Sequence, residues 1–384
     1  ADYSSATAAV TVNLEEGVAS GGFGADTLAS IENVSAGSGA DSLSGDTSTN
    51  SLSGAAGNDT LNGGAGNDSL DGGDGLDTAD YASATTSVSV NLGAGTTSGA
   101  LGADSLSSIE NVNGGTGADS LIGDSNTNSL NGGAGNDTLN GGAGDDALQG
   151  GAGNDSLIGG TGTDSADYSS ATDAVAVNLL AGTTSGSLGS DTLSSIENVN
   201  SGTGADSLIG DSNTNSLSGG GGNDTLDGGA GNDALNGGDG IDTADYSSAT
   251  GAINVDLLAG SASGALGADS LALIEKVLAG TGADSLTGDT TNNSLSGGAG
   301  NDTLNGGAGN DSLSGGDGLD TADYSSATGA VNVDLGAGTS SGALGVDALS
   351  SIENVSCGTG SDSLSGDSTN NTLRGGAGND TLNG

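Results

Sequence analysis

The chain has 384 residues, and its 50 acidic residues against two basic ones give a formal net charge of −48. This charge argues against nucleic acid and anionic membrane surfaces as partners because both would repel the chain, and no apolar run approaches the roughly 20 residues of a membrane span. Glycine supplies 79 residues while histidine, proline, methionine and tryptophan are absent, so the chain cannot fill a thick globular core. A chain of this composition is expected to be disordered unless a cation offsets its self-repulsion.

The chain is built from long modules, each marked by the tripeptide "ADY". The tyrosines of this tripeptide follow one another in steps of 78, 87, 78 and 78 residues, at Tyr3, Tyr81, Tyr168, Tyr246 and Tyr324. One step is nine residues longer because of an additional phrase, "GGAGDDALQ" at 141–149. We predict a single continuous repeat solenoid over 1–384 with five modules, 1–78, 79–165, 166–243, 244–321 and 322–384. Because the fifth module stops inside a nonapeptide, we expect the chain to be a segment of a longer repetitive polypeptide.

Within each module a nine-residue phrase recurs. Fourteen such phrases begin at residues 54, 63, 72, 132, 141, 150, 159, 219, 228, 237, 297, 306, 315 and 375. One apolar residue returns every nine positions, as at Leu121, Leu130 and Leu139. This spacing lacks the three-to-four-residue period of a helix and predicts very short strands between tight turns. The glycines of the turns supply backbone that can adopt positive φ, which Asn and Asp also tolerate.

Each module also contains a segment that breaks the nine-residue spacing. Between Val88 and Val112, the stretch "SVSVNL" at 87–92 alternates apolar and polar residues, which predicts a longer half-buried strand that widens the coil. Two half-coils in this region would give eight half-coils per module and would place Tyr81 and Tyr168 on opposite faces. Three would give nine, and the two tyrosines would share a face. The sequence leaves both alternatives open.

The phrase "GGAGNDTLN" at 132–140 fits every position of the pattern G-G-x-G-x-D-x-U-x, in which U is a large apolar residue. This pattern is the calcium-binding nonapeptide of RTX (repeats-in-toxin) proteins, and the chain resembles that family over its whole length. The resemblance implies an all-β fold, a right-handed parallel β-roll of the hemolysin type, which is a calcium-binding β-solenoid of short strands and Gly/Asp turns. It also implies that each nonapeptide forms half a coil, so that phrase i stacks on phrase i+2.

The resemblance further implies multiple Ca²⁺ ions along the turns, each held by the position-six carboxylate and by backbone carbonyls around positions two and four. Calcium prefers six to eight hard oxygen ligands, and one Asp per turn puts like charges about 5 Å apart along an edge. Without a cation this row of charges would push the coils apart. The alternative is that Asp caps backbone amides without metal, but Asn or Ser would then serve in most copies.

The predicted calcium ligands follow from the positions of the motif. At position six of the regular nonapeptides they are Asp59, Asp68, Asp137, Asp146, Asp155, Asp224, Asp233, Asp302, Asp311 and Asp380. Phrases with Ala at the core position add Asp77, Asp164, Asp242 and Asp320, and the "GADSL" phrases add Asp41, Asp119, Asp206, Asp284 and Asp362. The glycines of positions two and four are Gly57, Gly64, Gly66, Gly133, Gly135, Gly142, Gly144, Gly151, Gly153, Gly220, Gly222, Gly229, Gly231, Gly298, Gly300, Gly307, Gly309, Gly376 and Gly378.

Other repeated residues are expected to have structural roles. An uncharged residue occupies position six in one register, where we expect turn or ladder roles and weak or no metal binding, at Asn50, Asn128, Asn215, Asn293 and Asn371. The glutamates of the "IEN" and "IEK" phrases are expected to be structural or solvated, at Glu32, Glu110, Glu197, Glu275 and Glu353. The five tyrosines are expected to pack on the edge of the roll. Cys357, the single cysteine, is interpreted as a tolerated small residue.

No catalytic constellation is visible, since a chain without histidine lacks the commonest general base, and we expect no enzymatic activity. We predict a calcium-dependent extracellular structural protein, a stiff rod that serves as a filament, surface layer or adhesin shaft. Its ends would be covered by self-association or by other segments of a longer chain. The alternative is the folding and secretion module of a toxin or hydrolase, and an ice-binding roll is disfavoured. The resemblance implies type I secretion from a Gram-negative-type bacterium, and hence an extracellular or cell-surface location.

Overall fold

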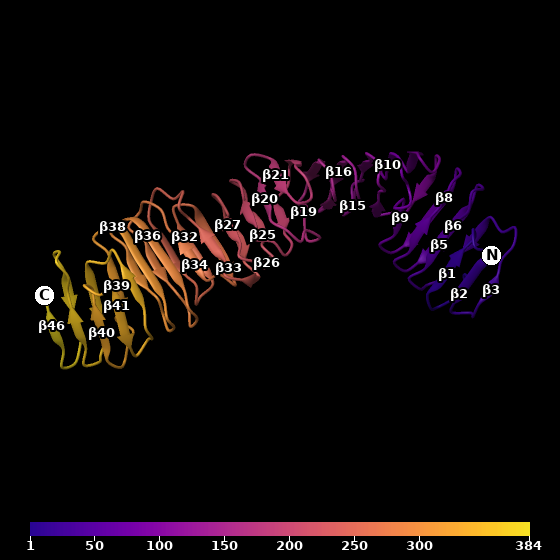
Figure 1. The fold of residues 1–384 in the computed structure, drawn as a ribbon. Helices are drawn as coiled ribbons and strands as arrows, with labels where there is room; N and C mark the ends of the chain where they lie inside the picture. Colours follow the sequence, from indigo (N-terminus) through magenta and orange to yellow (C-terminus); the bar gives the residue numbers. More distant parts are fainter. The chain divides into compact units, whose positions relative to one another are not determined.

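The computed structural model describes residues 1–384, which form short strands, β1 to β46, joined by turns (Figure 1). The structure contains no helix, so it contains no helix that is long and apolar enough to cross a membrane. The chain divides into two compact units: unit 1 comprises Ala1–Ala171 and Ala181–Asn200, and unit 2 comprises Thr172–Leu180 and Ser201–Gly384. Each unit has two sheets, here called sheet A and sheet B, with the apolar side chains buried between them.

Unit 1 contains the strands of the first two modules and part of the third. In spatial order, its sheet A consists of β4 (Asn33–Ser35), β6 (Ser51–Ala56), β8 (Ser69–Asp74), β12 (Ser105–Ser107), β11 (Thr96–Gly99), β10 (Val88–Asn91), β14 (Ser120–Ile122), β16 (Thr138–Ala143), β18 (Ser156–Thr161), β22 (Thr192–Ser194) and β21 (Thr183–Gly186). Its sheet B consists of β3 (Asp26–Thr27), β2 (Val18–Gly21), β1 (Val10–Asn13), β5 (Ser42–Ser44), β7 (Thr60–Asn62), β9 (Thr78–Asp80), β13 (Asn111–Asn113), β15 (Ser129–Asn131), β17 (Ala147–Gln149), β19 (Ser165–Asp167) and β23 (Asn198–Asn200).

Unit 2 repeats the same arrangement. Its sheet A consists of β20 (Val175–Asn178), β24 (Ser207–Ile209), β27 (Thr225–Asp227), β30 (Thr243–Asp245), β34 (Lys276–Leu278), β36 (Ser294–Gly300), β38 (Ser312–Gly318), β42 (Ala348–Ser350), β41 (Thr339–Gly342), β40 (Val331–Asp334), β44 (Ser363–Ser365) and β46 (Thr381–Asn383). Its sheet B consists of β25 (Ser216–Ser218), β28 (Ala234–Asn236), β33 (Gly267–Ala272), β32 (Ser261–Gly264), β31 (Ile253–Asp256), β35 (Ser285–Thr287), β37 (Thr303–Asn305), β39 (Thr321–Tyr324), β43 (Asn354–Cys357) and β45 (Thr372–Arg374). A small separate ladder joins β26 (Gly221–Gly222) to β29 (Asp239–Gly240).

The parallel strands formed by successive nonapeptides pair with a spacing of 18 residues, which is two phrases. In sheet A of unit 1, Leu121 pairs with Leu139, and Leu139 pairs with Leu157. In sheet B of the same unit, Leu130 pairs with Leu148. All five leucines are at most 1% exposed, and burying one leucine contributes about 1.5–3 kcal/mol. Phrase i therefore stacks on phrase i+2, which confirms the parallel β-roll, with one large core residue in each half-coil.

The irregular segment of each module is an antiparallel meander within one sheet. In unit 1, β10 pairs antiparallel with β11, which pairs antiparallel with β12. The outer strands of the meander run parallel to their neighbours, β12 beside β8 and β10 beside β14. In the opposite sheet, β9 pairs directly with β13. The predicted half-buried strand is confirmed in β10, but the prediction that the segment forms two or three alternating half-coils is wrong, because all three strands lie in one sheet.

The meander decides on which sheet each module begins. Tyr81 follows β9 and Tyr168 follows β19, and both strands belong to sheet B of unit 1. The Tyr3 amide instead donates to the carbonyl oxygen of Ser35 in sheet A. In unit 2, Tyr246 follows a strand of sheet A and Tyr324 ends a strand of sheet B. Modules within a unit therefore alternate between sheets except across the additional phrase, which forms β17 and restores the sheet of the preceding module.

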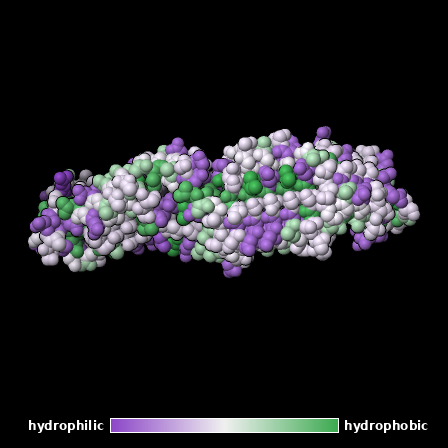
Figure 2. All heavy atoms as spheres, turned by 90° about the horizontal axis from the view of Figure 1, so that it is seen from above, coloured by the Kyte–Doolittle hydropathy of each residue, from purple (hydrophilic) through white to green (hydrophobic).

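Some large apolar side chains remain on the surface in turns. Leu76, Leu180 and Leu258 are 57%, 75% and 69% exposed. On the face drawn in Figure 2, apolar residues form several groups between polar ones. Apolar atoms contribute much of any folded protein's surface, so these residues need no special role.

Candidate metal centre

The turns stack so closely that a side chain does not fit at position four. Gly135 has a φ of 143°, a backbone conformation that favours glycine. A Cβ on Gly135 would overlap the carbonyl oxygen of Gly117, and a Cβ on Gly153 would overlap the carbonyl oxygen of Gly135. At position two, the Gly133 carbonyl oxygen accepts the amide of Ala152 in the next coil at 2.9 Å and keeps a second lone pair. Carbonyl oxygens of both positions therefore lie between successive coils.

The position-six carboxylates form columns along the turns, one residue per coil. The amide of Asp119 donates to Oδ1 of Asp137 at 2.7 Å, and the amide of Asp137 donates to Oδ1 of Asp155 at 2.8 Å. The amide of Asp146 donates to Oδ1 of Asp164 in the same way, at 2.8 Å. We call such a series of position-six residues an aspartate column. One oxygen of each carboxylate thus caps a backbone amide, a role that an uncharged Asn could also perform.

The second oxygen of these carboxylates has no partner. Oδ2 is buried and accepts no hydrogen bond in Asp59, Asp68, Asp77, Asp137, Asp146, Asp155, Asp164, Asp224, Asp233, Asp242, Asp284, Asp302, Asp311, Asp320 and Asp362. Buried polar atoms in folded proteins almost always have a partner, and an unpaired buried charge is costly. Amide capping therefore accounts for only one oxygen of each carboxylate. A bound cation would satisfy the other.

The position-one glycine makes room at the unpaired oxygen. A Cβ on Gly132 would collide with Oδ2 of Asp137 and would lie 2.6 Å from the carbonyl oxygen of Gly150 in the next coil. Those two oxygens therefore border one space that a side chain would fill. The motif predicts carbonyl ligands around positions two and four, and this position was not predicted, although the doubled glycine of the motif marks it.

Burial makes the columns electrostatically unfavourable without a cation. Desolvation raises the pKa of Asp59 from 3.8 to about 6, and the charges of Asp41 and Asp77 add to this effect, while the Asp41 amide opposes it. The pKa values of other column members also rise to about 6, again chiefly through burial, at Asp155, Asp224, Asp233, Asp302 and Asp311. A divalent cation between coils would remove this penalty.

The "GADSL" aspartates divide into two groups. Asp41 and Asp119 are saturated: each accepts one strand amide on Oδ1 and, on Oδ2, the amide of Gly37 or Gly115, at 3.1 Å and 2.7 Å. Asp206 receives the hydroxyl of Ser201 on its second oxygen. Asp284 and Asp362 keep an unpaired Oδ2. Only these last two resemble the regular column members.

The position-six asparagines each accept a turn amide on Oδ1, but the Nδ2 of Asn293 is buried without a partner. Oδ1 of Asn128 accepts the amide of Asp124 at 2.7 Å, and its Nδ2 donates to the carbonyl oxygen of Glu110 at 3.0 Å. Asn50 makes the equivalent pair of bonds, to the Asp46 amide and the Glu32 carbonyl. These contacts are the turn roles expected from the sequence.

Four buried aspartates that were not predicted from the sequence have a protein donor on the second carboxylate oxygen. The Tyr81 hydroxyl donates to Oδ2 of Asp104 at 2.9 Å, while Oδ1 of Asp104 accepts the amide of Asp68. The same pair recurs at 2.8 Å in Tyr168–Asp191, Tyr246–Asp269 and Tyr324–Asp347. Tyr81 is 2% exposed, and burial followed by the charge of Asp104 raises the pKa of its phenol. These four tyrosines therefore do more than pack, because the hydroxyl of each is a neutral donor to the last aspartate of a column.

Replacing Tyr81 by Phe is expected to lower the free energy of unfolding by about 1–3 kcal/mol, because the buried Asp104 carboxylate loses its donor. Urea denaturation in excess calcium measures this change. Tyr3→Phe is the control, since Tyr3 donates at 3.1 Å to the exposed Asp26 and should cost less. Equal effects of the two substitutions would contradict the assigned role.

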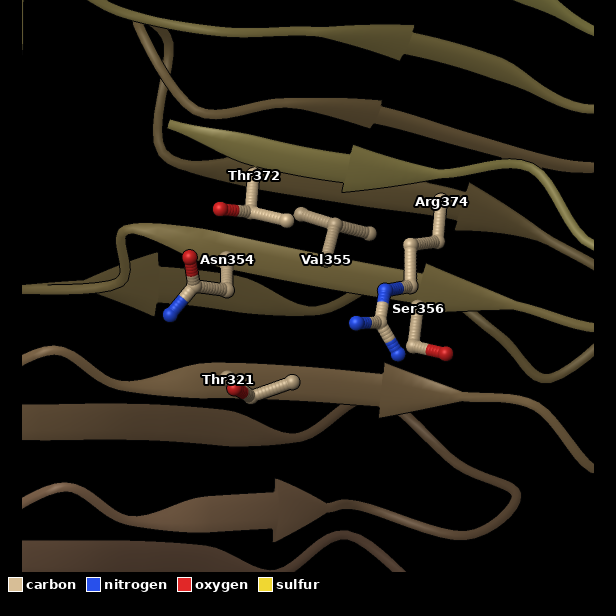
Figure 3. A pocket seen from close by; sticks show the side chains of 6 residues that line it. All are labelled: Thr321, Asn354, Val355, Ser356, Thr372 and Arg374. Atoms are coloured by element: carbon tan, nitrogen blue, oxygen red, sulfur yellow. The ribbon is translucent and has the colours of Figure 1, made fainter. Parts of the chain in front are cut away.

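A shallow pocket of about 270 Å³ lies apart from the columns, on sheet B of unit 2 (Figure 3). Its walls come from β39, β43 and β45, and the Arg374 guanidinium extends over β43 beside Ser356 (Figure 3). The remaining lining residues are Thr321, Asn354, Val355 and Thr372. The pocket has no carboxylate, thiol or imidazole, so it is not a metal site.

The donor set of the columns fits calcium. Nowhere do three carboxylate or thiol side chains gather in one place, so a cation would take most of its ligands from backbone carbonyls. Hard oxygen ligands in a flexible arrangement are what calcium uses, whereas a site rich in soft ligands would suit other metals. The unpaired Oδ2 of the column residues would hold the ion, and the carbonyls between the coils would complete the oxygen shell. The ion would neutralise the columns and join one coil to the next.

Comparison with known proteins agrees with this chemistry. The profile of the RTX calcium-binding nonapeptide repeat, four copies long, matches residues 29–61, 44–79, 99–139, 131–166, 209–244, 275–303, 287–322 and 358–384. These ranges cover more than half of the chain, and the gaps between them fall mainly on the meanders. No curated protein matches the chain. The chain belongs to the family of RTX calcium-binding nonapeptide repeat proteins.

Proposed function

We propose that this chain is an extracellular structural element whose rigidity depends on calcium. The observation that carries the proposal is the unpaired, buried Oδ2 that recurs in successive coils. Each such oxygen destabilises the metal-free roll and becomes a ligand when calcium binds, so metal binding and folding would be one event. The proposed ligands are the aspartates with an unpaired Oδ2 and the carbonyls of the neighbouring turn glycines.

The proposed location follows from the same coupling. Inside a cell, where free calcium is low, the columns would repel themselves and the chain would stay unfolded, which suits export through a type I system. Outside the cell, calcium would fold the modules into a stiff rod that serves in a filament, surface layer or adhesin shaft. We further propose that the five modules continue one solenoid, and that copies or neighbouring segments cover its end strands.

The export-module alternative places the same roll beside another domain of a secreted toxin or hydrolase. Both proposals share the calcium-dependent fold, and they differ in what the rod is attached to. A calcium-loaded chain that polymerises in electron micrographs favours the structural role, whereas a monodisperse monomer favours the export module.

Removing calcium is expected to abolish the β-sheet signal in far-ultraviolet circular dichroism. The measurement compares the chain in excess calcium, in a calcium chelator, and in magnesium at the same concentration. Magnesium is a fair control because it demands a stricter octahedral shell and gives up its water reluctantly. A β signal that persists in the chelator would show that calcium does not hold the roll together.

A further inference from the structure

Each block of regular coils ends at an aspartate whose next neighbour is not a nonapeptide. These residues are Asp77, Asp164, Asp242 and Asp320, and all four are fully buried with an unpaired Oδ2. In Asp77, Oδ1 accepts the amide of Asp59 at 2.7 Å, as in the rest of the column. The unpaired Oδ2, which in a regular column would face the next coil, therefore lies beside the segment that follows the meander. We call this place the module junction.

A strained carbonyl supplies the oxygen that the missing nonapeptide would have provided. A Cβ on Gly72 would lie 2.5 Å from Oδ2 of Asp77 and would collide with the carbonyl oxygen of Ser108. In a regular coil, the corresponding space beside Gly132 is bordered by Oδ2 of Asp137 and the carbonyl oxygen of Gly150. The Ser108 carbonyl thus takes the place of the position-one carbonyl of a next coil.

The backbone conformation that aims this carbonyl recurs at every junction. Ser108 has a φ of 49°, in the left-handed region that residues other than glycine seldom adopt. The equivalent residues at the other three junctions, Ser195, Leu273 and Ser351, have φ between 50° and 54°. Strain of this kind persists only where the surroundings enforce it, and it often marks a binding site.

The junction glutamate continues the column in the same way. Oε2 of Glu110 accepts the amide of Asp77 at 2.9 Å, which is the bond that Oδ1 of a next column aspartate would make. Glu197, Glu275 and Glu353 make the same bond at the other junctions, at 2.8, 2.9 and 2.9 Å. Burial and then the charges of Asp77 and Asp124, partly offset by backbone amides, raise the pKa of Glu110.

The junction is open to water on its outer side. A cavity of about 300 Å³ reaches Ser108, Glu110, Asp124 and Asn126. The equivalent cavity in unit 2, about 180 Å³, reaches Leu273, Glu275, Asp289 and Thr291. A hydrated ion can therefore approach the junction without opening the roll.

We propose that each module junction is a calcium site of its own, in which the junction glutamate is a ligand together with the buried Oδ2 and the left-handed carbonyl. The sites are Asp77–Ser108–Glu110, Asp164–Ser195–Glu197, Asp242–Leu273–Glu275 and Asp320–Ser351–Glu353. The inference rests on the proposed calcium-dependent function and assigns glutamates outside the nonapeptide to it. The ion would bind both the last regular coil and the segment that follows the meander. It would also neutralise the unpaired carboxylate oxygen at the end of the column.

The junction of the fourth module carries a natural competitor. Lys276 stands after Glu275, where the other junctions have Asn111, Asn198 and Asn354. Burial raises the pKa of Asp242, while the Asp224 amide and the positive charge of Lys276 oppose that rise. The lysine already compensates part of the negative charge, so this junction is expected to bind calcium more weakly than the other three.

The test compares two triple variants that remove the same charge. Glu110→Gln, Glu197→Gln and Glu353→Gln alter three junctions, and Gln keeps an oxygen that can accept the aspartate amide. Glu15→Gln, Glu16→Gln and Asp145→Asn, all at exposed positions outside the junctions, form the control. Equilibrium dialysis with elemental analysis counts the bound calcium, and circular dichroism in excess calcium checks the fold. We expect about three fewer ions per chain in the junction variant, one per altered site, and no loss in the control.

Lys276→Asn provides a second test that does not depend on weakening the fold. It should strengthen the binding of one ion by about 10-fold or more, which is 1.4 kcal/mol or more. A junction variant that keeps the wild-type number and affinity of ions, or a Lys276→Asn variant with unchanged affinity, would overturn this inference. A wild-type chain that folds without calcium would instead overturn the proposed function, so the two failures are distinguishable.

Discussion

Replacing four column aspartates by asparagine is expected to weaken calcium binding by at least 10-fold at each altered site and to raise the calcium concentration needed for folding. The substitutions are Asp137→Asn, Asp146→Asn, Asp155→Asn and Asp164→Asn, all residues with an unpaired Oδ2. Asn keeps the oxygen that accepts the neighbouring amide but loses the charge that would face the ion. Changes to groups that merely support a metal ligand cost about 10- to 100-fold, so loss of a direct ligand should cost no less.

Isothermal titration calorimetry and calcium titrations followed by circular dichroism measure this effect. The control removes four charges from exposed residues outside the columns, Asp74→Asn, Asp145→Asn, Asp239→Asn and Asp317→Asn. If general self-repulsion set the calcium requirement, both quadruple variants would shift the titration equally. A larger shift for the column variant is expected, and equal shifts would contradict the assignment of the columns as ligands.

The stability of the metal-free chain and that of the calcium-loaded chain are expected to depend on pH in opposite directions. In the metal-free roll, burial raises the pKa of Asp59 from 3.8 to about 6, so the folded state binds protons more tightly than the unfolded state. Its stabilisation is complete below pH 3.8 and is lost as the pH rises through about 6. Lowering the pH should therefore restore β structure to the chain in chelator, because protons neutralise the columns in place of calcium.

Calcium reverses this dependence because it binds the deprotonated carboxylates. With calcium present, lowering the pH through about 6 should release ions and raise the midpoint concentration for folding. Circular dichroism between pH 4 and 7.5, at low protein concentration because the isoelectric point is about 4.1, follows both effects. Added sodium chloride is the control for general charge screening. A metal-free chain with the same β signal across this range would contradict the role of the buried carboxylates.

The regular coils are predictable from the sequence because one phrase encodes one half-coil. The nine-residue return of Leu121, Leu130 and Leu139 fixes the alternation between sheets, and the structure pairs them with partners 18 residues away. The position-six aspartates could be assigned from the same register. The core leucine and the position-six aspartate are both set within one nonapeptide, so the family pattern predicts them directly.

The meander and the column ends could not be predicted in the same way. The alternation of apolar and polar residues in "SVSVNL" predicts a half-buried strand. The same alternation occurs whether the neighbouring strand is parallel or antiparallel, so it does not predict the meander. The bond from Tyr81 to Asp104 joins residues 23 positions apart, and only the three-dimensional return of the chain brings them together. The difference between a saturated Asp119 and an unpaired Asp137 likewise depends on whether an amide lies at the second oxygen.

The most direct test is a crystal structure of the calcium-loaded chain with long-wavelength anomalous diffraction, which locates each calcium ion. The columns predict anomalous peaks beside the unpaired Oδ2 of residues such as Asp137 and Asp155, and none beside Asp104 and Asp191, whose oxygens receive a tyrosine hydroxyl. Peaks confined to exposed carboxylates, or no peaks along the columns of a folded chain, would contradict calcium as the partner of the buried carboxylates.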